Sequence, residues 1–194
     1  MKKILNLTWL VLLFGIVMAS CNKDDDKIIP IDEDWKKANG EAFTLRGLNS
    51  EKSGFEKLDS QTGDGYILYR VIKEGTDKTP IYYTSKVKAH YKGCLIKDKD
   101  GNIIDDLDTV LDKGVQFDNK LNEDGHDPVE FEVGGNIIEG WKTALQHMHV
   151  GDRWEIWIPY QLGYGISGDS RGSVVILPYS TLVFDIEVTE ITEQ

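Results

Sequence analysis

The most distinctive residues of this chain are aromatic side chains that recur between positions 91 and 184, one beside a carboxylate and another between glycines. They are Tyr91, Phe117-Asp118, Trp141, Tyr164 and Phe184. Aromatic residues that alternate along strands usually belong to a core. Around a cavity they would instead exclude water from whatever group is bound there. The sequence contains no Walker loop and no H-E-x-x-H helix, so nucleotide and zinc-protease chemistry lack support.

These residues fall within short motifs whose order is informative. The motifs are Val87 to Gly93 (VKAHYKG), Phe117-Asp118, Ile137 to Trp141 (IIEGW), Ile158-Pro159, Leu162 to Gly165 (LGYG) and Thr181 to Asp185 (TLVFD). In this order they resemble the FKBP-type peptidyl-prolyl cis-trans isomerases, and chance agreement becomes less credible with each ordered match. The resemblance implies an α+β fold in which an antiparallel β-sheet curls around one short α-helix. It also implies an enzyme that needs neither cofactor nor metal.

The resemblance assigns roles to individual side chains. Trp141 matches the floor of the proline site, Asp118 the carboxylate that flanks it, and Tyr164 the phenol that bonds a substrate carbonyl. The walls and their neighbours match Tyr91, Phe117, Ile138, Phe184, Ile137 and Ile176. Either Phe131 or Val129 completes the rim, and the sequence does not choose between them.

The implied reaction is rotation about an Xaa-Pro amide, whose barrier of about 18–20 kcal/mol comes from amide resonance. Proline-containing polypeptides are the implied substrates, and macrolides such as rapamycin the implied inhibitors. A rival interpretation keeps the fold but not the catalysis, as a chaperone or adaptor of a surface or motility complex.

Two departures from the family pattern stand out. Asp118 is followed by Asn119 and Lys120, where many members have an arginine that partners the carboxylate. The stretch from Gly93 to Phe117 is also unusually long. We expect an insertion near residues 97–114 at the rim of the proline pocket, because both neighbouring motifs supply pocket walls. Its acidic residues are interpreted as a solvated hairpin tip at Asp100-Gly101 rather than a metal site, since the glycine spacing does not fit an EF-hand.

Periodicity places these motifs on particular elements. Apolar residues alternate with polar ones over 87–91, 154–158 and 182–189, which predicts antiparallel strands with one wet face. Trp141, Ala144, Leu145 and Met148 recur at helical spacing, which predicts one short helix. A further helix is predicted over 34–48, within a spacer that covers residues 27–64.

The beginning of the chain predicts export. Residues 1–20 carry Lys2 and Lys3 before an apolar run, and Met18-Ala19-Ser20-Cys21 resembles a lipobox. We therefore expect a signal peptide over 1–20, a lipid anchor to the membrane at Cys21, an acidic tether and spacer over 21–64, and the isomerase domain over 65–194. The predicted location is the cell envelope, as an outer-membrane lipoprotein exposed at the surface. A formal net charge of -11 argues against nucleic acid as a partner.

Overall fold

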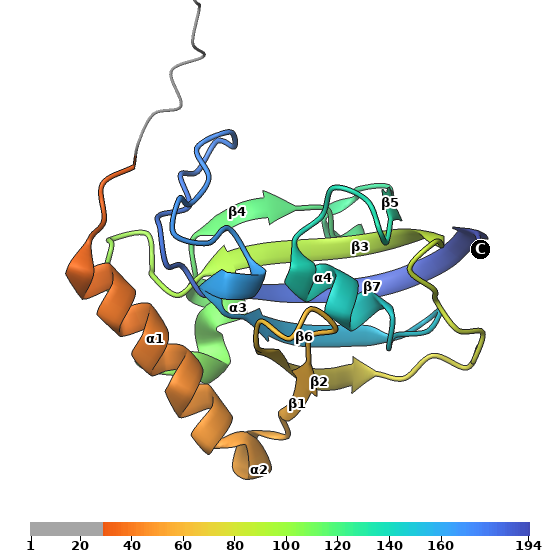
Figure 1. The fold of residues 1–194 in the computed structure, drawn as a ribbon, viewed down its shortest axis with the longest axis horizontal. Coiled ribbons are helices and arrows are strands. Elements are labelled where there is room, and N and C mark those ends of the chain that lie inside the picture. Colours follow the sequence, from red (N-terminus) through yellow and green to blue (C-terminus); the bar gives the residue numbers. More distant parts are fainter. Residues whose placement is uncertain (1–28) are drawn as a thin grey trace, which may run out of the picture.

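A single antiparallel sheet organises the chain (Figure 1). The computed structural model describes residues 29–194, so the predicted signal segment and Cys21 lie outside the described residues. The sheet order is β1-β2-β6-β7-β3-β4, and β5 also pairs with β3. The strands are β1 (Glu56–Asp59), β2 (Tyr66–Lys73), β3 (Lys86–Leu95), β4 (Gln116–Asn119), β5 (Val129–Glu132), β6 (Arg153–Ile158) and β7 (Leu182–Glu193). The helices are α1 (Glu33–Leu48), α2 (Ser50–Ser53), α3 (Val110–Lys113) and α4 (Glu139–Leu145), with 3-10 turns η1 (Leu107–Thr109), η2 (Asn122–Asp124) and η3 (Tyr160–Leu162). The predicted α+β class is confirmed.

The helix α4 packs on one face of the sheet, which we call the inner face. Ala144 and Leu145 are fully buried there, in one core cluster with Ile156 and Ile158 of β6. Gly140 permits the close approach, because a Cβ at this position would lie 2.5 Å from Ile158 Cγ2. The helical spacing recognised in the sequence therefore places the next residue, Trp141, directly against the sheet.

The opposite, outer face is not wet at its centre, contrary to the alternation pattern. Strand register puts Glu155 and Trp157 of β6 on the same face as Val183 and Asp185 of β7, and each of these residues is at most 5% exposed. Trp157 is covered by Arg46 of α1, whose guanidinium carbon lies 4.8 Å from the ring centroid. The two carboxylates are paired with other arginines, Glu155 with Arg70 at 2.6 Å and Asp185 with Arg153 at 2.8 Å. Sequence alternation describes single strands and does not show which other segments cover them.

The sequence interpretation of residues 27–64 as a spacer does not hold for residues 33–59. The helix expected over 34–48 is present, and the Asp32 side chain caps it by accepting from Trp35 N at 2.9 Å. However, α1 buries Trp35 and Ala42 in the main core, and β1 pairs with β2. Residues 33–59 therefore belong to the folded domain and are not a spacer in front of it.

The predicted position of the insertion at the pocket rim is wrong. Its tip does turn at Gly101, whose N–H bonds Asp98 O at 3.1 Å. Ile104 and Val110, however, are buried, and α3 packs against β3 and β7. Asp108 accepts a hydrogen bond from Arg46 Nη1 at 2.6 Å, which joins the insertion to α1. Residues 97–114 thus extend the core on the outer face. Among residues 29–194, no helix has the length and apolar character needed to cross a bilayer.

Candidate functional site

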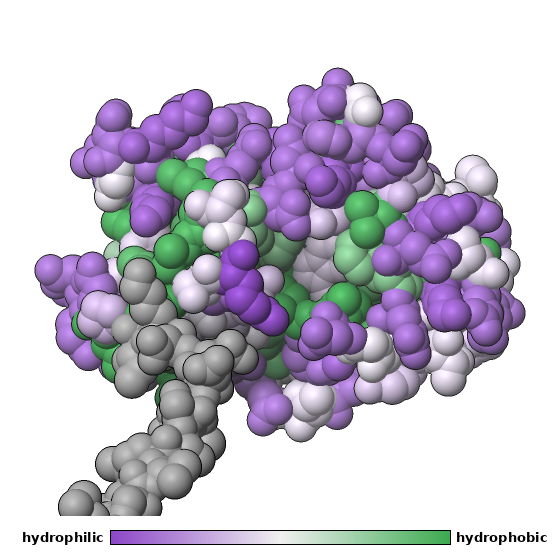
Figure 2. Space-filling view, turned by 90° about the horizontal axis from the view of Figure 1, so that it is seen from above, coloured by the Kyte–Doolittle hydropathy of each residue, from purple (hydrophilic) through white to green (hydrophobic). Residues whose placement is uncertain are grey.

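A cavity of about 590 Å³ opens between β3, β4, β5, α4, β7 and the loop that follows η3. Figure 2 shows this end of the molecule, where apolar residues form a hollow between hydrophilic margins. The structure brings together here every side chain that the resemblance assigned to the proline site: Tyr91, Phe117, Asp118, Phe131, Ile137, Ile138, Trp141, Tyr164, Ile176 and Phe184. Val129 is not among the lining residues, so Phe131 takes the rim position that the sequence left open.

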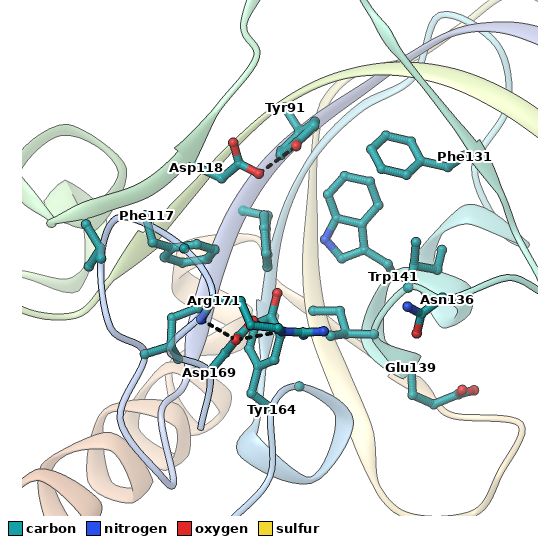
Figure 3. Close-up of a pocket in the computed structure, with 17 residues that line it drawn as sticks. Tyr91, Phe117, Asp118, Phe131, Asn136, Glu139, Trp141, Tyr164, Asp169 and Arg171 are labelled. Atoms are coloured by element: carbon teal, nitrogen blue, oxygen red, sulfur yellow. Dashed lines mark hydrogen bonds and ion pairs between the residues drawn. The ribbon is translucent and has the colours of Figure 1, made fainter. Parts of the chain in front are cut away.

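A continuous set of aromatic rings forms the wall and floor of the cavity (Figure 3). The Trp141 ring lies edge-on to both Tyr91 and Phe184, with centroids 5.1 and 5.4 Å apart. Phe117 meets Phe184 at 5.4 Å, and Phe131 tilts against Trp141 at 5.0 Å. Edge-to-face contacts of this kind are favourable beyond the area they bury, so the rings hold one another in a fixed arrangement.

Gly93 of β3 makes room for two of these rings. A Cβ at this position would lie 2.5 Å from Phe117 Cζ and 2.7 Å from Phe184 Cε1. Real side chains do not approach so closely, so any other residue would displace a pocket wall. The glycine that closes the first sequence motif therefore has a packing reason.

The polar groups of the upper wall are tied to each other. Tyr91 Oη donates to Asp118 Oδ2 at 2.7 Å, and Asn119 N donates to Asp118 Oδ1 at 2.9 Å. Burial, followed by the hydrogen bond to Asp118, raises the pKa of Tyr91. In place of the arginine partner expected from the resemblance, Asp118 therefore accepts hydrogen bonds from the Tyr91 phenol and the Asn119 backbone amide.

Two donors remain available to a bound group. Ile138 adopts an extended conformation at the N-cap of α4, and within the described residues its N–H has no hydrogen-bond acceptor. Figure 3 shows Tyr164 rising from the loop after η3 into the cavity, and burial raises its pKa above the ordinary value. Both groups can therefore donate to a carbonyl placed between the aromatic walls.

The sequence did not predict the polar margin of the cavity. Its members are Asn136, Glu139, Asp169 and Arg171. Asp169 accepts from Arg171 Nε at 2.9 Å and from Nη2 at 3.0 Å, and Figure 3 shows this bidentate pair beside Tyr164. The Arg171 hydrogen bonds lower the pKa of Asp169, so the pair is ionised at neutral pH. These residues lie in an irregular loop, where no periodicity indicates which side chains point inward.

Gly168 to Gly172 also spell G-x-S-x-G, the pattern of a hydrolase nucleophile elbow, which the sequence interpretation overlooked. That motif requires a strand-to-helix turn. Here Ser170 is exposed in a loop between η3 and β7, and the segment follows no strand and starts no helix. The local structure therefore gives no support to a serine nucleophile.

The acidic tip of the insertion has a structural explanation. Asp98 Oδ1 accepts from Asp100 N and Asn102 N, each at 2.9 Å. These bonds lower the pKa of Asp98, with the Asn102 amide contributing most. Within residues 29–194, no group of three or more His, Cys, Asp or Glu side chains is arranged to hold a metal ion. The carboxylate stabilises the turn.

Comparison with known proteins agrees with the geometry. Residues 78–189 match the family model described as FKBP-type peptidyl-prolyl cis-trans isomerase. The chain is 36% identical over 151 residues to the FKBP-type 22 kDa peptidyl-prolyl cis-trans isomerase of Escherichia coli, covering 78% of this chain and 62% of that protein. It is 33% identical over 127 residues to the macrophage infectivity potentiator of Trypanosoma cruzi, covering 66% of this chain and 54% of that protein. The chain therefore spans little more than half the length of the curated relatives it matches.

A solved structure supports the fold assignment. The peptidyl-prolyl cis-trans isomerase of Pseudomonas syringae pv. tomato superposes with a TM-score of 0.59 at 27% identity. The superposition covers 85% of this chain and all of that one. The fold is thus similar to that of a protein named for this activity.

Proposed function

The chain belongs to the FKBP-type peptidyl-prolyl cis-trans isomerase family, and from this premise we propose that it accelerates cis–trans exchange of Xaa-Pro bonds in exported or envelope polypeptides. The observation that carries the proposal is the convergence of aromatic walls and two free donors on one cavity. A hydrolase or a metal enzyme would need a nucleophile with its base, or a set of ligands. Amide rotation needs neither.

The aromatic walls act on the electronic change that accompanies rotation. A planar amide carries charge on its oxygen through resonance, and the amide loses much of that charge when it is twisted. A water-poor pocket lined by Trp141, Tyr91 and Phe184 binds the less polar, twisted state better than the planar one. Only such differential binding lowers a barrier.

The polar groups orient the substrate. In this proposal the Ile138 N–H and the Tyr164 hydroxyl donate to substrate carbonyls near the proline. Asp118 accepts a hydrogen bond from Tyr91, and its carboxylate would lie beside the pyrrolidine ring of the bound proline. Acceleration from tens of seconds to milliseconds corresponds to about 5.5 kcal/mol, which a dry pocket with a few hydrogen bonds can supply.

Substrate preference follows from the lining. An apolar residue before proline would bury against Phe117 or Phe131, which favours binding by about 25 cal/mol per Å² of apolar area. The same aromatic surface would accept the apolar part of a macrolide such as rapamycin. We therefore expect large apolar residues before proline to be preferred over small or charged ones.

Placement in the cell envelope is part of the proposal and is supported by sequence alone. Acylation of Cys21 after removal of residues 1–20 would anchor an outer-membrane lipoprotein, exposed at the surface. Burial of acyl carbons contributes about 0.8 kcal/mol per CH₂, so the lipid would account for membrane attachment. Cys21→Ala should move the protein from washed membranes to the soluble fraction. Retention of the variant on membranes would refute the anchor.

The activity is tested with tetrapeptides that differ only before proline, using Leu, Phe, Ala and Glu. The chain beginning at Asn22 should raise the exchange rate of each, with Leu and Phe highest. Trp141→Leu, which keeps an apolar side chain but removes the indole floor, serves as the matched variant. A folded protein that accelerates none of the peptides would exclude the enzyme and leave the adaptor interpretation.

A further inference from the structure

The pocket depends on one long irregular segment, residues 163–178, which we call the pocket loop. It supplies Tyr164, Asp169 and Ile176 to the cavity lining. Inside the loop, Asp169 and Ile176 exchange backbone hydrogen bonds of 2.8 Å in both directions. The loop contains no helix or strand, so its conformation depends on how its ends are held.

The C-terminal end of the loop is held by α1. Trp35 Nε1 donates to Ser180 Oγ at 3.0 Å, and that hydroxyl donates to Leu177 O at 2.7 Å. Asn39 Oδ1 accepts from Thr181 N at 2.7 Å, and Thr181 Oγ1 donates to Asn39 O at 3.1 Å. Asn39 is 0% exposed, so these bonds are formed away from water, where an unpaired partner is costly.

The residue between these contacts has an unusual backbone. Tyr179 has φ 63°, a region that non-glycine residues adopt only when their surroundings enforce it. Its N–H bonds Gly165 O at 3.0 Å, which closes the loop on itself. Its ring packs on Tyr160 at 4.8 Å, and Lys36 Nζ of α1 lies 4.6 Å from its centre. The conformation of Tyr179 is therefore stabilised by contacts with both α1 and η3.

We propose that α1 is a positioning element for the pocket and that Trp35 and Asn39 are positioning residues for the reaction. None of the α1 residues lines the cavity, so they would act only through the pocket loop. Fixing the base of a loop removes conformations that binding would otherwise have to suppress. The inference rests on the proposed isomerase function for its effect on KM, but not for its effect on the loop.

The test uses the full chain with Trp35→Phe, which keeps an aromatic core residue but removes the N–H, and with Ser180→Ala, which removes its acceptor. Amide hydrogen exchange at Asp169 and Ile176 reports the loop directly. Loss of one hydrogen bond should accelerate this exchange by about 2- to 10-fold. KM for an Xaa-Pro peptide should rise by a similar factor with little change in kcat, because loop ordering affects ground state and transition state alike.

Two comparisons make the test specific. The double variant should be no worse than Ser180→Ala alone, because Ser180→Ala already removes the bond from Trp35 together with the bond to Leu177 O. Asp108→Asn loosens the contact of α1 with the insertion at Arg46 without touching the loop, and it should leave exchange at Asp169 and Ile176 unchanged.

Unchanged exchange in Trp35→Phe would overturn the proposal, and so would equal acceleration in Asp108→Asn. If the unmodified protein catalysed no isomerisation, the proposed function would fail. The exchange rates would still decide the role of α1, so the two failures are distinguishable.

Discussion

Burial raises the pKa values of the two phenols of the cavity, Tyr91 and Tyr164. A phenol with a raised pKa keeps its proton further into alkaline solution, so both remain neutral donors at neutral pH. Since the proposed reaction transfers no proton, kcat/KM should be nearly flat from about pH 6 to 8, unlike the bell-shaped profile of a general acid and base. A profile with a distinct limb in this range would contradict the account.

The same shift affects stability at high pH. An ordinary tyrosine has a pKa of about 10, so the unfolded chain loses protons that buried Tyr91 retains. The native state then binds more protons than the unfolded state, and the free energy of unfolding falls as pH rises above about 10. Urea unfolding of the wild type and of Tyr91→Phe between pH 8 and 11 should show a weaker decline in the variant. An equal fall in the free energy of unfolding of both proteins would show that Tyr91 is not the cause.

Tyr164→Phe removes one hydroxyl from the cavity while keeping the ring. A single hydrogen bond contributes about 0.5–1.5 kcal/mol, so kcat/KM should fall by roughly tenfold at most. Peptide exchange rates with matched protein concentrations measure this. A loss of several orders of magnitude would mean that Tyr164 does more than orient a carbonyl.

Gly93→Ala should displace Phe117 or Phe184, because its Cβ has no space between the rings. Overpacking costs about 1–3 kcal/mol of stability, and kcat/KM should fall more strongly than in Tyr164→Phe because a wall moves. Gly40→Ala is the matched control. It lies in α1 with nothing within 4 Å of the added Cβ, so it should stabilise the helix by about 0.5–1 kcal/mol. Full activity in Gly93→Ala would show that the walls can adjust.

At the residue scale, the ordered motifs identified lining residues on helices and strands, and the resemblance also identified Tyr164 and Ile176 in the pocket loop. Trp141 follows a helix start, and Phe184 alternates along a strand, so ordered motifs could place them in one cavity. Arg171 and Asp169 were missed because loop geometry is set by contacts such as the Asp169–Ile176 bridge. No spacing rule encodes contacts of this kind.

Among the elements, the insertion differs most from its prediction. It was placed at the pocket rim from its neighbours in sequence, whereas Val110 packs on the outer face. A strand has two faces, and the sequence shows where an excursion begins without showing which face it covers.

Val110→Ala tests that assignment. Removing two buried methyl groups should lower the free energy of unfolding by about 2 kcal/mol. Peptide isomerisation should be unchanged at a temperature where the variant is folded, because no residue of 97–114 lines the cavity. Urea unfolding and peptide exchange on the same sample measure both. A loss of activity with unchanged stability would instead indicate that the insertion contributes to the pocket.

At the scale of the whole molecule, α1 and the pocket belong to one packed core. In Figure 1, α1 lies where the described chain begins, beside the sheet, and it packs on the outer face while the cavity opens on the inner one. The net charge argues against nucleic acid and the first residues predict export, but the sequence interpretation placed α1 in a spacer. Its few buried residues, among them Trp35 and Asn39, do not form a recognisable apolar stripe.

Exchange NMR on a Leu-Pro tetrapeptide tests the central claim most directly, because it observes rotation itself without a coupled protease. With the chain beginning at Asn22 in catalytic amounts, cis–trans exchange should rise by orders of magnitude above the uncatalysed rate of about one event in 10–100 s. Trp141→Leu should reduce that acceleration strongly. A protein with native amide dispersion that leaves the exchange rate at background would contradict the account.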